Sequence, residues 1–343
     1  MFLIPFALMM NDKFFNSLII NKLHHSSSLF IIHHSSLLNL MNQANHAFLV
    51  TLALVAFGYA IKKGGFITEN EGKTLSKFVM HTTFPAIVLL SFMRLHFEAH
   101  LFLLPLISFL FGSTMLTIAW FVFKSYPNPL RGILMMGSGG LNTIMFAFPI
   151  VEGIWGRDAL TFAIMFDLGN TIVVFGFVYS IGSYFSMSGK SSASLVLKKV
   201  SRLPALQALT IGLIINILHI PIPIVITDCL ETIAKANKPI VLILMGIYLN
   251  FVFEKKQFWD VSNVLMIRYA AGLTAILLLY TFMLPCVERS VLIVLVVAPV
   301  GLTVLPFSDE FGYDTRIAGL LVNLSLIVSF VLMWALVLGL GLF

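Results

Sequence analysis

Asp167 and Asn170 are the residues best suited to hold or exchange charge, because they lie three apart inside a mostly apolar stretch. A helix would place both on one face. If this stretch lies in a membrane, its carboxyl group costs about 2.5–3.5 kcal/mol to insert, and such groups usually face a cavity. We therefore expect Asp167 to be a proton-titrating or coupling group that shares a polar site with Asn170. The alternative is a structural carboxyl group that hydrogen-bonds a broken helix.

Asn142 marks a second candidate site, because Gly137, Gly139, Gly140 and Pro149 interrupt the apolar stretch around it. Its amide can donate and accept hydrogen bonds, which suits either a substrate carboxylate or exposed backbone groups. A helix broken here would also present N–H groups and a positive dipole end to an anion. No cofactor or metal ion is required for this chemistry.

A similar interruption occurs later in the chain, at Pro299, Gly301 and Pro306. Broken backbone inside a membrane leaves polar groups that protein, ion or substrate must satisfy, so two matched breaks predict a transport site. The final apolar stretch offers Asn323 and Ser325 as the matching polar side chains. Pro149 and Pro299, one in each break, complete this candidate substrate-binding set.

Lys238 is a lone cation beside Pro239 in an apolar stretch. It could snorkel toward the membrane surface, or it could serve as a fixed cation that pairs with Asp167 or attracts an anion.

Cys229 and Cys286 have no metal-binding or disulfide pattern, and we interpret both as structural. The sequence contains no phosphate-binding P-loop, no His-Glu-x-x-His and no paired Asp typical of intramembrane hydrolases.

The elements that position these residues must be membrane helices. Apolar residues form 59% of the chain, charged residues only 10%, and the mean hydropathy is +0.99. A soluble domain averages roughly 25% charged residues, so this chain could not cover two soluble domains with a polar surface. The net charge of +6 therefore indicates membrane topology rather than nucleic-acid binding.

Ten apolar stretches approach the roughly 20 residues that a membrane-spanning helix needs. They are 44–61, 75–93, 101–123, 132–154, 160–184, 203–220, 230–251, 264–284, 290–307 and 316–342. Two thirds of the 21 Lys and Arg residues, with Arg268 counted among them, belong to the side that holds the first loop. The positive-inside rule makes that side cytoplasmic, so both termini should face away from the cytoplasm.

Residues 1–43 differ from the rest, because they contain a near-duplication of His-His-Ser-Ser that begins at His24 and again at His33. We interpret them as a doubtful extension and expect translation to start at Met41.

The ten spans divide into two halves of five, repeat one at 44–185 and repeat two at 203–343, with a cytoplasmic linker at 186–202. Pro85 and Pro239 occupy matching positions in the second span of each half. An odd number of spans per half inverts the second half relative to the first.

The motifs of these breaks resemble those of the bacterial branch of the auxin efflux carrier family, over about residues 44–343. The similar stretches are Gly140-Leu141-Asn142-Thr143, Phe148-Pro149-Ile150-Val151, Gly156, Phe166-Asp167-Leu168-Gly169-Asn170, Ala298-Pro299, Pro239 through Gly246, and Pro85. The resemblance implies an all-α membrane protein of ten spans in two inverted five-helix repeats, with broken spans four and nine crossing near mid-membrane. It also implies a scaffold of spans 1, 2, 6 and 7 and a moving unit of spans 3–5 and 8–10.

We therefore expect a secondary transporter, not an enzyme, in the bacterial inner (plasma) membrane. It would move small organic anions, such as dicarboxylates or auxin-like carboxylates, by alternating access driven by protons or the membrane potential. The alternatives are a sodium-coupled carrier of the bile-acid symporter type, a membrane-embedded enzyme or a sensor. Its expected partners are an organic anion and the lipid bilayer but no nucleic acid, and a homodimer is compatible with this reading.

Overall fold

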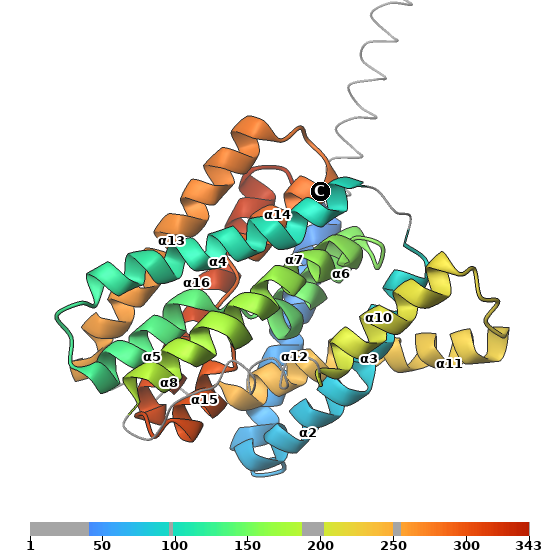
Figure 1. Cartoon of the computed structure of the whole chain (residues 1–343). Coiled ribbons are helices and arrows are strands. Elements are labelled where there is room, and N and C mark those ends of the chain that lie inside the picture. Colours follow the sequence, from blue (N-terminus) through green and yellow to red (C-terminus); the bar gives the residue numbers. More distant parts are fainter. Residues whose placement is uncertain (1–40, 96–98, 187–201, 250–254, 343) are drawn as a thin grey trace, which may run out of the picture.

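A computed structural model describes residues 41–95, 99–186, 202–249 and 255–342 (Figure 1). Nearly all of the predicted extension and most of the predicted linker lie outside these residues. The regular structure of the described residues is helical, apart from one antiparallel bridge between Leu141 and Val300. The all-helical prediction is confirmed for them.

The first half of the chain begins with the helix Met41–Lys63. It is followed by α2 (Glu69–His81), α3 (Thr83–Met93), η1 (Ala99–Phe102), α4 (Leu103–Val122), α5 (Asn128–Gly139), η2 (Thr143–Ala147), α6 (Phe148–Trp155), α7 (Leu160–Ile172), η3 (Val173–Val178) and α8 (Tyr179–Phe185). The second half contains α10 (Pro204–Ile217), α11 (Ile224–Lys235), α12 (Asn237–Tyr248), α13 (Lys255–Phe282), α14 (Val287–Val296), α15 (Val304–Glu310) and α16 (Thr315–Gly339).

Six helices of the described residues are long and apolar enough to cross a membrane. They are Met41–Lys63, Glu69–Met93, His100–Val122, Leu160–Phe185, Phe258–Phe282 and Thr315–Gly339. Each matches one of the ten predicted spans. The other four predicted spans are shorter or interrupted: 132–154 and 290–307 break near their middles, 203–220 contains only the 14 residues of α10, and 230–251 is divided between α11 and α12. The ten-span inverted repeat therefore stays a prediction.

The helix interruptions follow from local sequence. Pro85 is the third residue of α3 and Pro239 the third of α12, and each helix begins where the preceding one has just ended. Proline cannot donate a backbone hydrogen bond and is tolerated in a first helical turn, so both positions favour a new helix start. α2 begins with a capping box in which Thr68 and Glu71 bond each other's backbone N–H groups.

The helices form two groups that meet along one seam (Figure 1). In one group, α10 and α11 pack against α3, and α12 packs against α2. In the other, α4 packs against α5 and α7, and α13 packs against α5 and α14. The first group contains elements of predicted spans 2, 6 and 7, and the second contains elements of spans 3, 4, 5, 8 and 9. The division into a scaffold and a moving unit stays a prediction.

Glycine allows the closest helix contacts. A Cβ atom on Gly169 of α7 would lie 2.0 Å from the backbone oxygen of Pro105 in α4. A Cβ on Gly246 of α12 would lie 2.0 Å from the backbone oxygen of Val55 in the first helix. Lipid offers little hydrophobic drive for helix association, so close backbone approach at small residues holds membrane helices together.

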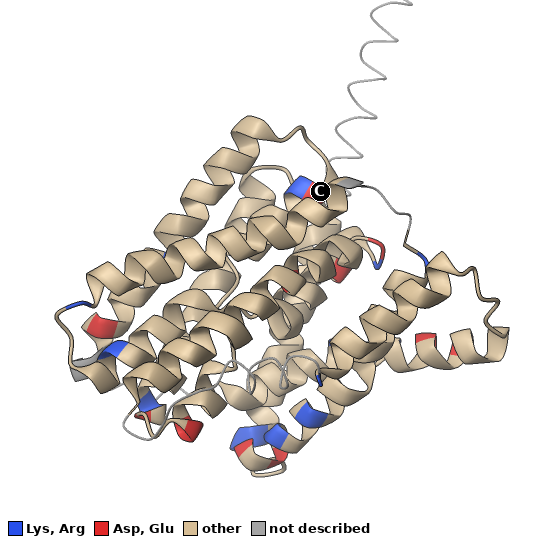
Figure 2. Cartoon of the chain, in the orientation of Figure 1, with Lys and Arg blue, Asp and Glu red and all other residues tan. Residues whose placement is uncertain are grey.

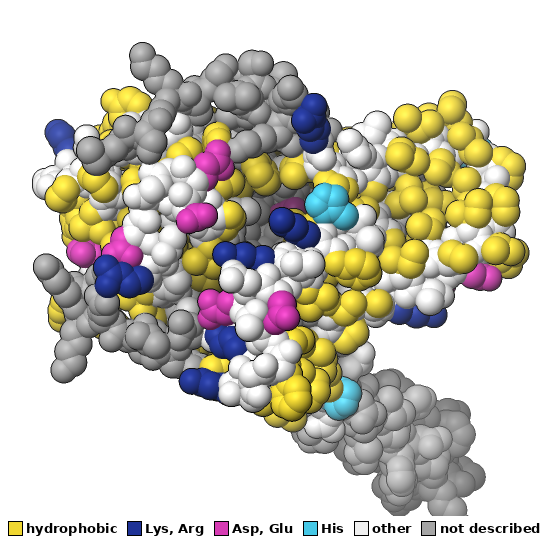
Figure 3. Space-filling model, turned by 90° about the horizontal axis from the view of Figure 1, so that it is seen from below, with side chains coloured by type: hydrophobic (Ala, Val, Ile, Leu, Met, Phe, Trp, Pro, Cys, Tyr) yellow, Lys and Arg dark blue, Asp and Glu magenta, His cyan; other side chains and the backbone are white. Residues whose placement is uncertain are grey.

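Charged residues lie mainly at the ends of the helices, and the middle of the molecule is almost uncharged (Figure 2). Side chains of both signs gather on the face seen from below (Figure 3). An apolar band between charged ends is the arrangement that a bilayer requires.

Candidate functional site at the crossing of two interrupted helices

The two predicted breaks meet at one place in the fold. The first separates α5 from η2 and α6, and the second separates α14 from α15. The N–H of Asn142 donates to the carbonyl oxygen of Pro299 at 2.8 Å, and the N–H of Gly301 donates to that of Gly140 at 3.1 Å. The broken segments thus satisfy part of each other's backbone, as buried backbone in a membrane requires.

Polar side chains from two further helices complete the crossing. Asn170 of α7 pairs with Leu141 twice, because its Oδ1 accepts from the Leu141 N–H and its Nδ2 donates to the Leu141 carbonyl, both at 3.0 Å. Ser325 of α16 plays a corresponding part, since its Oγ accepts from the N–H of Val300 at 2.9 Å. The predicted residues Asn170 and Ser325 therefore lie at the crossing, one for each break.

Asp167 is buried beside the first break. Its Oδ1 accepts hydrogen bonds from the Thr143 hydroxyl and from Asn170 Nδ2, the latter at 3.0 Å. The side chain of Asp167 is 7% exposed. The structure thus brings Asp167, Asn170, the Thr143 hydroxyl and the Leu141 backbone into one polar cluster within an apolar region. Whether Asp167 titrates or couples stays a prediction.

Asn142 carries the donor that is free in this cluster. Its side chain is 5% exposed, and its Nδ2 has no hydrogen-bond partner among the described residues. A buried donor without a partner costs about 1–3 kcal/mol. A ligand acceptor that reaches this amide would remove that cost. Contact of Asn142 with a substrate stays a prediction.

Arg268 of α13 joins both breaks and was not predicted as a site residue. Its Nη1 donates to the carbonyl oxygens of Gly137, Ser138 and Gly140 at 3.1, 3.1 and 2.8 Å. Its Nη2 donates to those of Ala298 and Pro299, both at 3.0 Å. The side chain is only 2% exposed.

The assignment of Arg268 to the cytoplasmic positive charges is therefore wrong. It lies well inside α13, and the backbone carbonyls of two distant segments solvate it in place of water. Its position inside the predicted span 264–284 was the signal in the sequence, because an ionisable residue within a membrane helix usually has a buried partner.

Of the two proline candidates, one lies at the crossing. Pro149 is buried within the continuous helix Thr143–Trp155 that η2 and α6 form, beyond the first break. Pro299 lies in the second break and supplies the carbonyl oxygen that both Asn142 and Arg268 contact. Asn323 of α16 is buried and donates to the carbonyl of Gly319 in its own helix at 2.9 Å. Direct contact of these residues with substrate stays a prediction.

Lys238 is half-buried at the start of α12, and its Nζ lies against α6. A Cβ atom on Gly153 would lie 2.9 Å from this nitrogen. No hydrogen bond or ion pair connects Lys238 with Asp167 in the described ranges. The neighbouring Asn237 is buried and its Oδ1 accepts from the hydroxyl of Thr83 at 2.7 Å, which links α12 to α3.

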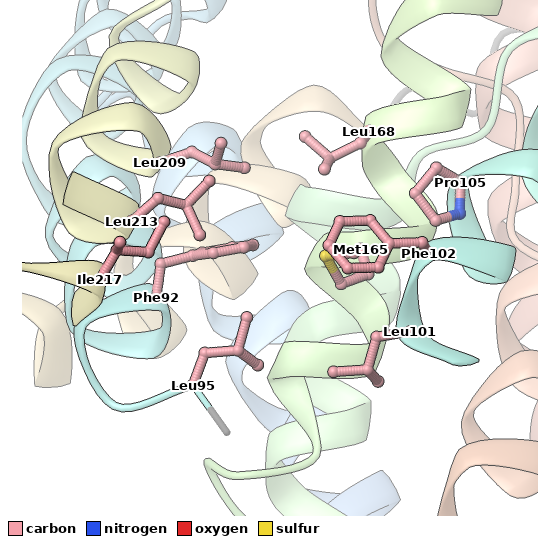
Figure 4. A pocket seen from close by; sticks show the side chains of 10 residues that line it. All are labelled: Phe92, Leu95, Leu101, Phe102, Pro105, Met165, Leu168, Leu209, Leu213 and Ile217. Atoms are coloured by element: carbon pink, nitrogen blue, oxygen red, sulfur yellow. The ribbon is translucent and has the colours of Figure 1, made fainter. Parts of the chain in front are cut away.

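An apolar pocket of about 230 Å³ opens along the seam between the two helix groups (Figure 4). α3 and α10 line one wall, and η1, α4 and α7 line the other. The lining residues are Phe92, Leu95, Leu101, Phe102, Pro105, Met165, Leu168, Leu209, Leu213 and Ile217. A wall of this kind has no side-chain donor or charge with which to recognise an anion, so the polar crossing remains the better site.

Comparison with known proteins identifies the family. Residues 44–337 match the family model described as "Membrane transport protein". The chain belongs to this family. The predicted resemblance to the auxin efflux carrier family is thereby confirmed.

Two archaeal relatives share most of the chain. An uncharacterized transporter of Methanothermobacter thermautotrophicus is 28% identical over 239 residues, which cover 67% of this chain and 78% of the relative. An uncharacterized transporter of Methanocaldococcus jannaschii is 24% identical over 281 residues, which cover 78% of this chain and 90% of the relative. Family membership together with the apolar helices makes the chain a multi-pass membrane transporter and not an enzyme.

Proposed function

We propose that this transporter is a secondary carrier of small organic anions, with its substrate site at the crossing. The observation that carries this proposal is that backbone carbonyl groups at the crossing are hydrogen-bonded to a cation, whereas an amide donor there has no partner. The Arg268 guanidinium occupies carbonyl groups at the end of α5 and in the broken segment that follows α14. On the other side of the first break, where η2 begins, lies the amide of Asn142, whose Nδ2 has no partner among the described residues. Positive helix ends with a free donor favour an anion.

Two contacts support alternating access between inverted halves. Thr83 lies two residues before Pro85 and Asn237 two residues before Pro239, and these matching residues hydrogen-bond each other. Leu141 and Val300, one from each break, form the antiparallel bridge. A residue that contacts its own counterpart lies on a pseudo-two-fold axis, as two inverted repeats would require. The proposed motion carries the crossing past the scaffold.

The proposed driving force is a proton gradient, with Asp167 as the coupling group, or the membrane potential. Asp167 shares its hydrogen bonds with Asn170 and Thr143, which also hold the first break. A change in its protonation would therefore change the same hydrogen bonds that shape the anion site.

Lys238 is proposed as a fixed cation that raises the local concentration of the anion. Its Nζ contacts α6, the helix that leads away from the first break. We expect Lys238→Met to raise the KM for uptake about threefold at low salt while kcat stays unchanged, because electrostatic steering acts on encounter. Kinetics of Lys238→Met that equal the wild-type kinetics at low and high salt would leave Lys238 with a packing role alone.

The proposed location is the bacterial inner membrane, with both termini outside the cytoplasm. Trp334 Nε1 donates to Asn45 Oδ1 at 2.8 Å. This bond joins the first part of the first helix to the last part of α16, which supports the proposal that both termini lie on the same side of the membrane. The bias of Lys and Arg toward the other side persists without Arg268.

The test is uptake by the full chain in proteoliposomes. We expect saturable uptake of labelled malate, malonate or indole-3-acetate that an inward proton gradient or an imposed potential stimulates. Asn142→Ala should lower uptake at least about tenfold through the lost substrate contact. Asn263→Ala is the matched control, because Asn263 is half-buried on α13 and bonds Tyr126 at 3.4 Å. Transport of cations or neutral solutes without any organic anion would contradict the proposal.

A further inference from the structure

The five carbonyl groups around Arg268 form a ready-made cation site. Two come from the last turn of α5, and three come from the broken segments that follow α5 and α14. Unwound backbone carbonyls and the C-terminal ends of half-helices are the groups with which broken-helix carriers coordinate a coupling cation. Here they converge on a guanidinium group that is covalently part of the chain.

We propose that Arg268 is the resident cation of this crossing and replaces a bound metal cation, so that the carrier works without sodium. This inference rests on the proposed function for its consequence in transport. The placement of the charge rests on the five hydrogen bonds alone.

The geometry suits a permanent occupant. A guanidinium group is planar and always charged, and its fork of donors can serve two carbonyl clusters at once. Nη1 serves the first break and Nη2 the second, so one side chain joins both. A sodium ion leaves when the substrate leaves, but Arg268 cannot. The negative helix ends therefore stay neutralised throughout the transport cycle.

The hydrogen bonds of Arg268 also explain why donors, rather than these carbonyl acceptors, remain free at the crossing. With these carbonyl groups held by Arg268, the buried donors without a partner at the crossing are the Asn142 amide and Arg268 Nε, among the residues that the structure describes. The site would then accept an anion without a co-bound metal cation. It follows that the energy for uphill transport must come from protons, from the potential or from exchange.

The first experiment measures thermal unfolding of the purified full-length chain in detergent, without substrate. Wild type, Arg268→Ala and Arg289→Ala are compared in sodium chloride, in choline chloride, and in choline chloride with millimolar guanidinium chloride, at equal ionic strength. Arg289 is the matched control, because it is also buried but its Nη1 donates to a single carbonyl, that of Met283, at 3.0 Å.

We expect wild type to have the same midpoint in all three solutions. Arg268→Ala should unfold about 5–10 °C lower in choline, because buried carbonyls lose their donor. Sodium or guanidinium, which can enter the vacated site, should restore part of that loss. Arg289→Ala should show no such restoration. A saturable stabilisation of wild type by sodium would overturn the proposal, as would an Arg268→Ala midpoint that no small cation raises.

Arg268→Lys keeps the experiment decisive if Arg268→Ala does not fold. The ammonium group retains the charge but not the fork, so we expect a lower midpoint that does not respond to sodium. A sodium response of Arg268→Lys would contradict the role of the side-chain charge. Uptake assays then compare sodium with choline for wild type, and equal rates are expected. A chain that transports no organic anion would refute the proposed function, whereas the unfolding midpoints would still decide the role of Arg268.

Discussion

Asp167 is the residue whose substitution best distinguishes a role in proton coupling from a purely structural role. We expect Asp167→Asn to abolish stimulation of uptake by a proton gradient and to leave exchange of anion across the membrane within about threefold of wild type. The reason is that an asparagine oxygen can still accept from Thr143 and Asn170, but an amide cannot carry the proton. The measurement is uptake at opposite pH gradients and counterflow without a gradient.

Thr143→Val is the matched control for this residue. It removes the hydroxyl donor while the carboxyl group remains, so stimulation should persist at reduced rate. Full gradient stimulation in Asp167→Asn would show that Asp167 only positions the first break.

The sequence allowed prediction of those residues whose structural role depends on their neighbours in the chain. Gly140 ends α5 because of its own backbone conformation, and Asp167 and Asn170 share a face because of helix spacing. The place of Arg268 inside the predicted span 264–284 indicated burial, but its partners could not be predicted. Its partners Gly140 and Ala298 lie 128 and 30 residues away, and only the fold brings them together.

Among the helix–helix contacts, that of α4 with α7 positions the site most directly, because Asp167 and Asn170 lie on α7. We expect Gly169→Ala to destabilise the protein by about 1–3 kcal/mol, because the added Cβ would overlap the backbone oxygen of Pro105. The backbone cannot yield as a flexible side chain could. The free energy of unfolding in mixed micelles is the measurement.

Gly176→Ala is the control on the same continuous helical segment. A Cβ on Gly176 would meet no atom within 4 Å, so its effect should stay within about 0.5 kcal/mol. Equal effects of the two substitutions would show that helix propensity and not close packing governs this segment. The sequence could predict glycine within these spans but not which glycine touches a neighbouring helix, because helix pairing is a property of the fold.

The orientation of the whole molecule in the membrane is testable through its native cysteines. Cys229 in α11 and Cys286 at the start of α14 are both free and exposed, and the positive-inside rule predicts that both lie outside the cytoplasm. We expect a membrane-impermeant thiol reagent to label Cys286 in intact cells that carry Cys229→Ser. The reason is that Cys286 lies at the start of α14, directly after the turn from α13.

Ser125→Cys, introduced with both native cysteines replaced by serine, is the control for the opposite side. Ser125 lies in the exposed turn between α4 and α5, beside Lys124, so it should be labelled only after the cells are opened. The reverse pattern would invert the topology and place both termini in the cytoplasm. The assay reads sidedness without any transport step, so it tests the orientation even if the substrate proposal fails.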